Sequence, residues 1–144
     1  MLQRLLALIA ALAAISAVSS SAARADQRVA LVIGVAAYDE AEPLLNPVRD
    51  AEAVAARFRS LGYETRLFLN ASRAEMTAAL AALGKGEGAL DQAVIYFAGH
   101  GVQVDGANDL LPADWAADRP LDETGLSLRE IARAAAGAAR QTIF

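Results

Sequence analysis

The only histidine of the chain follows an apolar run and stands between two glycines. The run covers residues 92–98, and Gly99, His100 and Gly101 come directly after it. A histidine at a strand end can act as a general acid or base, which contributes about 10²–10⁴-fold to a rate. The glycines leave room for a substrate backbone beside the imidazole. The Gly101 N–H could donate a hydrogen bond to an oxyanion that develops during the reaction. Taken alone, the triplet is also compatible with a tight exit turn that carries an exposed histidine.

Composition limits the chemistry of this site. The chain has 144 residues, a net charge of −4, no cysteine and one histidine. The acidic balance offers no basic surface for nucleic acid. The cysteine and histidine counts exclude disulfides, thiolate metal sites and multi-histidine metal sites within this sequence. Only carboxylates remain as metal ligands, so we expect no metal or other cofactor, with calcium as the open case.

The first 25 residues read as a secretory signal. Arg4 precedes an apolar run over residues 5–18, and Ala23-Arg24-Ala25 has the A-x-A form of a cleavage site. The run is shorter than the roughly 20 residues that a membrane-spanning helix needs. We therefore expect an exported protein, periplasmic or secreted, whose mature chain begins near Asp26 without stable membrane insertion.

Apolar periodicity then predicts alternating strands and helices. Residues 28–35 are nearly all apolar, which is typical of a parallel strand covered on both faces. Asn46 is expected to cap a helix that has Pro47 at its first position and Gly62 as its left-handed end. Residues 63–69 alternate apolar and polar side chains, so this second strand is expected nearer a sheet edge.

The same pattern continues to a third strand. Ser72 and Glu75 form an expected capping box, and the helix that follows buries Met76, Ala79, Leu80 and Leu83. Glycines at 84, 86 and 88 predict a turn into the strand at 93–98. The order βαβαβ predicts a parallel sheet with helices on both faces. Ligands of such sheets bind beyond the carboxyl ends of the strands, where His100 is expected beside the first strand.

Residues after the triplet predict a hairpin, a loop, a helix and the start of a strand. Asp105-Gly106 is a hairpin signal, and residues 114–122 read as an acidic loop. Ser127 and Glu130 form a second capping box, opening a helix to about Ala139 with Leu128, Ile131 and Ala135 inward. A fourth strand is expected from about Arg140. Because the sequence stops within that strand, we expect a truncated domain.

These motifs, in this order, resemble the caspase-like peptidases, most closely bacterial members related to metacaspases. The resemblance covers about residues 28–144 and is most specific in the strand followed by Gly-His-Gly-Val-Gln. The segments that carry it are 28–34 with Tyr38, 45–47, Asp50-Ala51, 61–63, 96–103, Gly106, Asn108 and Leu111-Pro112. It implies a three-layer α/β/α fold with a mainly parallel sheet, of which residues 26–144 are the N-terminal part.

The resemblance also implies a Cys-His dyad endopeptidase that acts on proteins or peptides. His100 falls on the catalytic histidine of the family, and the cysteine is expected just beyond Phe144, at the end of the fourth strand. A neighbouring histidine lowers a thiol pKa and protonates the leaving amine. The N–H groups of Gly101 and of that cysteine would form the oxyanion hole.

Specificity is implied by one acidic position. Asp50 matches a metacaspase residue of the pocket for Arg or Lys, although an acid in a first helical turn also favours the helix dipole. Val35, Arg49 and Ala98 depart from the usual Asn, Asn and Ser of the family, which leaves fine specificity open. Many metacaspases require calcium, for which the candidate ligands are Asp105, Asp109, Asp114 and Asp118.

Two other functions compete with this interpretation. The absence of cysteine is compatible with an inactive caspase-like domain that binds peptides or proteins through the same cleft. A nucleotide-binding α/β domain is disfavoured, because the residues after Gly34 lack the G-x-G-x-x-G pattern. Oligomeric state has no signal in the sequence.

Overall fold

The computed structural model describes residues 26–83 and 90–144. The expected signal (1–25) and the glycine-containing turn (84–88) lie outside these residues. The described elements run in the order β1 (Arg28–Gly34), α2 (Pro47–Ser60), β2 (Glu64–Leu69), α3 (Arg73–Leu83), β3 (Gln92–Ala98), β4 (Gly101–Val104), β5 (Ala107–Leu110), α4 (Leu121–Thr124), β6 (Leu126–Ser127), α5 (Leu128–Ala135) and β7 (Arg140–Ile143).

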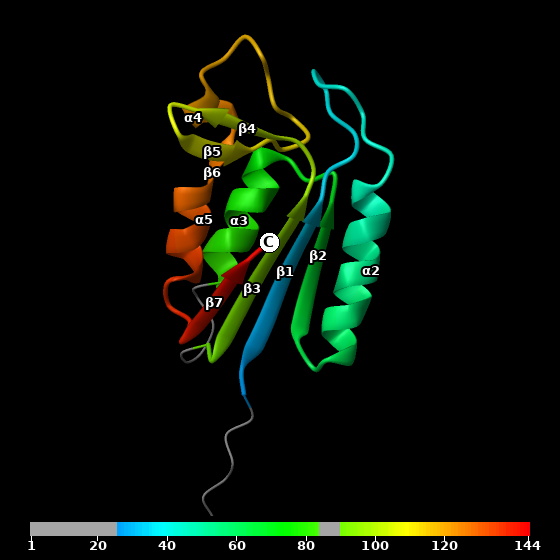
Figure 1. Cartoon of the computed structure of the whole chain (residues 1–144), viewed down its shortest axis with the longest axis vertical. Coiled ribbons are helices and arrows are strands. Elements are labelled where there is room, and N and C mark those ends of the chain that lie inside the picture. Colours follow the sequence, from blue (N-terminus) through cyan, green and yellow to red (C-terminus); the bar gives the residue numbers. More distant parts are fainter. Residues whose placement is uncertain (1–25, 84–89) are drawn as a thin grey trace, which may run out of the picture.

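A parallel sheet in the order β2-β1-β3-β7 forms the centre of the fold (Figure 1). The prediction of parallel strands in βαβαβ order is confirmed. The apolar strand β1 is internal and buried along nearly its whole length, as its composition predicts. Strand β2 lies at the edge with only partly buried or exposed side chains, as its alternating pattern predicts.

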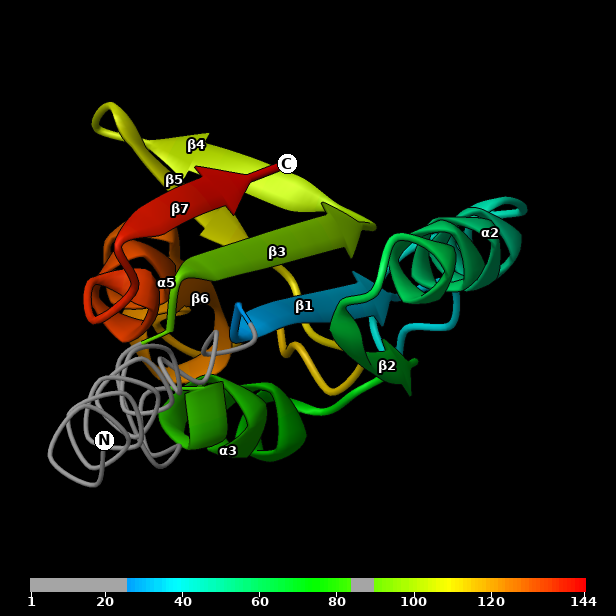
Figure 2. The same cartoon turned by 90° about the horizontal axis from the view of Figure 1, so that it is seen from below.

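Helices cover both faces of this sheet, which gives the three layers expected from the sequence (Figure 2). Successive side chains of β1 point to opposite faces. On one face, Ala30 and Val32 pack with Ala51 and Ala55 of α2. On the other, the larger cluster joins Leu31 and Ile33 to side chains of α3 and α5, among them Met76, Leu80, Leu83, Ile131 and Ala135.

Three of the four predicted helix-end signals form in the structure, and the cap at Asn46 does not. Both capping boxes form, at Ser72–Glu75 and Ser127–Glu130. Gly62 has the expected left-handed backbone, with φ of 81°. Asn46 precedes α2, but its side chain does not cap the helix: its backbone is already helical, and Oδ1 accepts from Arg49 Nη2 at 3.0 Å.

Two boundaries between residues 114 and 139 differ from the prediction. The loop expected over residues 114–122 forms as far as Pro120, and the short helix α4 then begins at Leu121 and is followed by the two-residue strand β6. The last helix, α5, ends at Ala135 rather than near Ala139. The alanine run favours helix, but Gly137 interrupts it and the chain turns at residues 136–137. Ala139 N–H then bonds to Leu90 O at 2.9 Å, just before β7.

A small antiparallel sheet, β4-β5-β6, stands above the carboxyl ends of the parallel strands (Figure 1). Its hairpin turns at Asp105 and Gly106, with φ of 50° and 78°, as the Asp-Gly signal predicts. Strand β7 pairs with β3 as the expected fourth parallel strand. No helix among the described residues is long and apolar enough to span a membrane.

Candidate active site at the carboxyl ends of the strands

His100 lies where β3 leaves the parallel sheet, next to the end of β1. Val35 N–H donates to Ala98 O at 2.8 Å, which holds the two strand exits together. The chain then enters β4 at Gly101, and Leu111 N–H donates to His100 O at 3.0 Å. The predicted position of His100, at a strand end beside the first strand, is therefore confirmed.

The imidazole of His100 is held by a backbone carbonyl. Its Nε2 lies 2.8 Å from the carbonyl oxygen of Glu42. A carbonyl oxygen can only accept, so Nε2 must carry the proton. In the neutral ring, Nδ1 is then the nitrogen with a free lone pair. In this geometry Nδ1 can accept a proton, while the hydrogen bond from Nε2–H to Glu42 O fixes the orientation of the ring.

The loop that supplies this carbonyl is tied to the tops of the strands. Asn70, after β2, has a left-handed φ of 51°, and its Oδ1 accepts from the N–H groups of Ala36 and Ala37 at 2.8 and 3.1 Å. Further along the loop, the Glu40 carboxylate accepts from Ala117 N–H at 2.8 Å. The sequence analysis did not identify Asn70, although asparagine tolerates this conformation better than most residues.

The two glycines of the triplet differ in how tightly their neighbours in this structure pack against them. A Cβ on Gly99 would lie 2.6 Å from the Tyr38 hydroxyl and 2.7 Å from the Phe97 ring. The absent side chain at Gly99 therefore makes room for Tyr38. A Cβ on Gly101 would be 3.4 Å from Asp109 O, an ordinary contact, so sterics inside this chain do not require glycine there.

Asp50 lies in the first turn of α2, which packs on the same end of β1. A Cβ on Gly34 would come within 2.6 Å of Pro47 O, so glycine at the end of β1 permits this close approach. Asp50 is exposed, and its carboxylate has no hydrogen bond or ion pair within the described residues. The structure therefore places Asp50 at the same end of the sheet as His100, without joining the two side chains.

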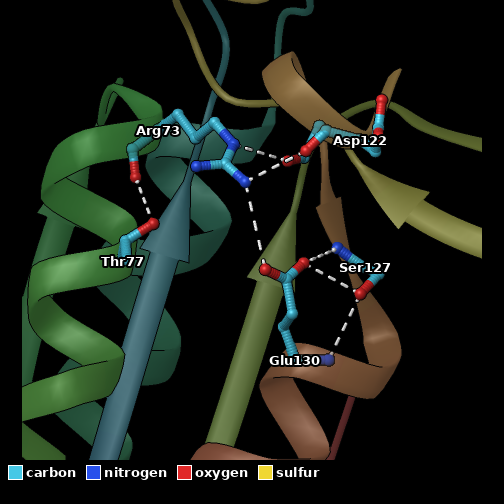
Figure 3. Close-up of polar contacts among 6 residues, drawn as sticks. Arg73, Thr77, Asp122, Ser127 and Glu130 are labelled. Atoms are coloured by element: carbon cyan, nitrogen blue, oxygen red, sulfur yellow. Dashed lines mark hydrogen bonds and ion pairs between the residues drawn. The ribbon is translucent and has the colours of Figure 1, made fainter. Parts of the chain in front are cut away.

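Arg73, at the start of α3, links this helix to α4 and α5 (Figure 3). Its Nε donates to Gly125 O at 2.9 Å and its Nη2 to Asp122 O at 3.3 Å. The same Nη2 lies 3.9 Å from Glu130 of the α5 capping box. Hydrogen bonds from Ser127 hold the pKa of the Glu130 carboxyl below its usual value. The sequence analysis missed Arg73, because its partners are mostly backbone carbonyls.

The four candidate calcium ligands do not assemble. Within residues 26–83 and 90–144 there is no group of three or more histidine or acidic side chains that could hold a metal ion. Asp114 Oδ1 accepts instead from Arg73 N–H at 2.7 Å. Asp109 is buried in β5, where its strand pairs with β6.

A sequence model of the caspase domain matches residues 27–132. The chain belongs to the caspase domain family. This membership agrees with the sheet order and with the histidine at the exit of β3. No curated protein sequence matches this caspase domain.

The fold of this caspase domain is similar to the crystal structure of protein GSU0716 from Geobacter sulfurreducens. The TM-score is 0.67 at 22% identity, over 82% of this chain and 49% of that one. The TM-score shows a common fold, and an identity of 22% carries the comparison no further than the fold. The caspase domain described here spans about half the length of that structure.

Proposed function

We propose that this caspase domain carries the histidine of a cysteine-type endopeptidase whose nucleophilic cysteine follows β7, just beyond Phe144. The family supports a peptidase in general terms. The observation that carries the specific proposal is the hydrogen bond from His100 Nε2 to Glu42 O, which leaves Nδ1 available as the base.

The register of β7 supports this position for the proposed cysteine. Strand β7 pairs with β3 from Gln92↔Arg140 to Ile95↔Ile143. Two hydrogen bonds extend the ladder, from Phe144 N–H to Ile95 O and from Phe97 N–H to Phe144 O, both at 2.9 Å. Continued in this register, the second and third residues after Phe144 would lie beside Ala98 and Gly99. Neighbouring strands are about 4.8 Å apart, so a thiol there would be close to His100.

The hairpin register supports a role for the Gly101 N–H. Gly101 faces Leu110 across the β4–β5 ladder, and Leu111 N–H bonds to His100 O. In an antiparallel ladder this bond places Gly101 and Leu110 in a pair that exchanges no hydrogen bonds. The Gly101 N–H therefore points away from β5, toward the edge of β4 that pairs with no strand among the described residues, where it could donate a hydrogen bond to an oxyanion.

The proposed reaction uses these groups in sequence. His100 Nδ1 takes the thiol proton, and the thiolate sulfur attacks the peptide carbonyl carbon. The N–H groups of Gly101 and of the cysteine stabilise the oxyanion. His100 returns the proton to the leaving amine as the C–N bond breaks, and water then hydrolyses the thioester.

Specificity and location complete the proposal. Asp50 is proposed to favour Arg or Lys before the scissile bond, since an exposed carboxylate without a partner can receive a cation. The substrates are proteins or peptides, and the protein is proposed to be exported through the signal at 1–25.

The test uses the full-length product and a set of fluorogenic peptides. We expect cleavage after Arg or Lys, loss of activity on alkylation of the cysteine, and a fall in kcat of at least about 10²-fold for His100→Ala. Circular dichroism of the variant checks that it folds. A folded full-length protein that lacks a cysteine after β7, or that cleaves no peptide, would support the inactive binding domain instead.

A further inference from the structure

The hydroxyl group of Tyr38 connects the exits of the two central strands. It accepts from His100 N–H at 2.7 Å and lies 3.1 Å from Val35 O, to which it donates. The carbonyl cannot donate, so both directions are fixed. One side-chain oxygen therefore joins the backbone after β1 to the backbone of the candidate catalytic histidine.

The Tyr38 ring also lies against the imidazole. The two ring centroids are 4.9 Å apart, with 48° between the planes. Burial raises the pKa of the Tyr38 hydroxyl, and the hydrogen bond from His100 N–H opposes this rise. The hydroxyl thus stays protonated at neutral pH and remains a donor to Val35. Gly99 permits this arrangement, because any Cβ there would collide with the hydroxyl.

We propose that Tyr38 is a positioning residue for His100. Its hydroxyl sets the backbone of the histidine, its ring limits the tilt of the imidazole, and the same loop delivers Glu42 O to Nε2. The consequence for catalysis rests on the proposed peptidase function, whereas the positioning itself does not. The Tyr38 hydroxyl bonds to the backbone of Val35 and His100 and forms no hydrogen bond with either ring nitrogen, so we assign it a role through His100 rather than on the substrate.

Tyr63 provides a matched control. Its hydroxyl donates to Gln92 Oε1 at 2.6 Å, and its ring packs on Phe58 at 5.1 Å between centroids. Tyr38→Phe and Tyr63→Phe therefore each delete one partly buried hydroxyl that has a hydrogen bond and a ring contact. Tyr63 and Gln92 stand at the opposite ends of β2 and β3 from His100.

The experiment measures, by NMR, the tautomer and the amide exchange rate of the single histidine of this chain. It requires no enzymatic activity. In the wild-type chain we expect one Nε2–H tautomer and a slowly exchanging His100 amide. Tyr38→Phe should mix the tautomers and speed exchange of that amide by about tenfold or more, while Tyr63→Phe should change neither. Gly99→Ala should reproduce the effect of Tyr38→Phe from the other side of the contact.

The outcomes separate positioning from general destabilisation. Equal effects of the two tyrosine variants, or no effect of Tyr38→Phe, would overturn the proposal. If Tyr38→Phe fails to fold, hydrogen exchange of the wild-type chain still tests the proposal. A His100 amide that exchanges as fast as an amide in an open loop is incompatible with the hydrogen bond to Tyr38. In the full-length peptidase, Tyr38→Phe is expected to lower kcat about tenfold or more with KM changed less than about twofold. Peptidase inactivity alongside the NMR effect would contradict the proposed function and leave the positioning role standing.

Discussion

The ring of His100 is bonded to the main chain of Glu42, with 2.8 Å between Nε2 and the carbonyl oxygen. The partners are 58 residues apart in sequence, and the Glu42 side chain takes no part in the bond. The support of the histidine therefore depends on the path of the loop from Ala36 to Asn46 rather than on the identity of residue 42.

Replacement of the Glu42 side chain should therefore have little effect. We expect Glu42→Ala to leave the kcat of the full-length peptidase within about twofold, because the carbonyl remains in place, against at least about 10²-fold for His100→Ala. Steady-state kinetics on an Arg or Lys peptide gives both values. A large loss of kcat in Glu42→Ala would show that the carboxylate, not the carbonyl, supports the histidine.

Asn70 should be the residue that holds the start of this loop. Aspartate keeps an acceptor and tolerates a positive φ, glycine keeps only the backbone freedom, and alanine keeps neither. The loss in free energy of unfolding should increase in the order Asp, Gly, Ala. Each lost hydrogen bond costs about 1 kcal/mol, and the left-handed backbone adds about 1 kcal/mol for alanine. Urea unfolding of the three variants checks the order.

Arg73 should stabilise the packing of α3 against α4 and α5 through the shape of its guanidinium. Arg73→Lys keeps the charge but cannot reach Gly125 O and Asp122 O together, so we expect most of the loss seen in Arg73→Ala. That loss should be about 1–3 kcal/mol in the free energy of unfolding. The exposed Arg133 of α5 is the control, and its alanine variant should stay within about 0.5 kcal/mol of wild type. Full rescue by lysine would indicate that charge alone matters.

Glu130 should make stability depend on acid pH. The hydrogen bonds from Ser127 lower the pKa of the Glu130 carboxyl in the folded state. The contribution of this carboxylate to the free energy of unfolding is therefore complete above its unfolded-state pKa and is lost as the pH falls through its folded-state pKa. Glu130→Gln should cost about 0.5 kcal/mol at pH 7, since this carboxylate is largely exposed, and nothing at the acid end of the titration. Urea midpoints at several pH values measure the difference, with the exposed Glu52→Gln as a charge-matched control. A difference in urea midpoint between Glu130→Gln and wild type that stays constant across pH would contradict this prediction.

Asp50 tests the proposed preference for basic residues. Asp50→Asn in the full-length peptidase should reduce kcat/KM for Arg and Lys peptides, mostly through KM, by about fivefold or more for a lost charge-assisted contact. Glu52→Gln, on the same helix and also exposed, should have no such effect. Equal effects of the two variants would point to long-range charge instead of a pocket.

The sequence by itself determined the order and type of the main elements and the place of His100. Hydrophobic periodicity, the two capping boxes and the Asp-Gly turn are local signals, read within a few residues, and each of them formed as predicted. The prediction failed where the alanine run outweighed Gly137 in placing the end of the last helix, and where the Asn46 side chain bonds to Arg49 instead of capping α2.

Only the tertiary structure decided how His100 is held. Tyr38, Glu42 and Asn70 act across 34 to 62 residues of sequence, and two of the three contacts use backbone N–H groups while the third uses a backbone carbonyl. Every residue except proline carries both of these groups, so the side-chain pattern does not reveal which of them will meet. The sheet brings the ends of β1, β2 and β3 to one edge, and this geometry selects the partners of the histidine.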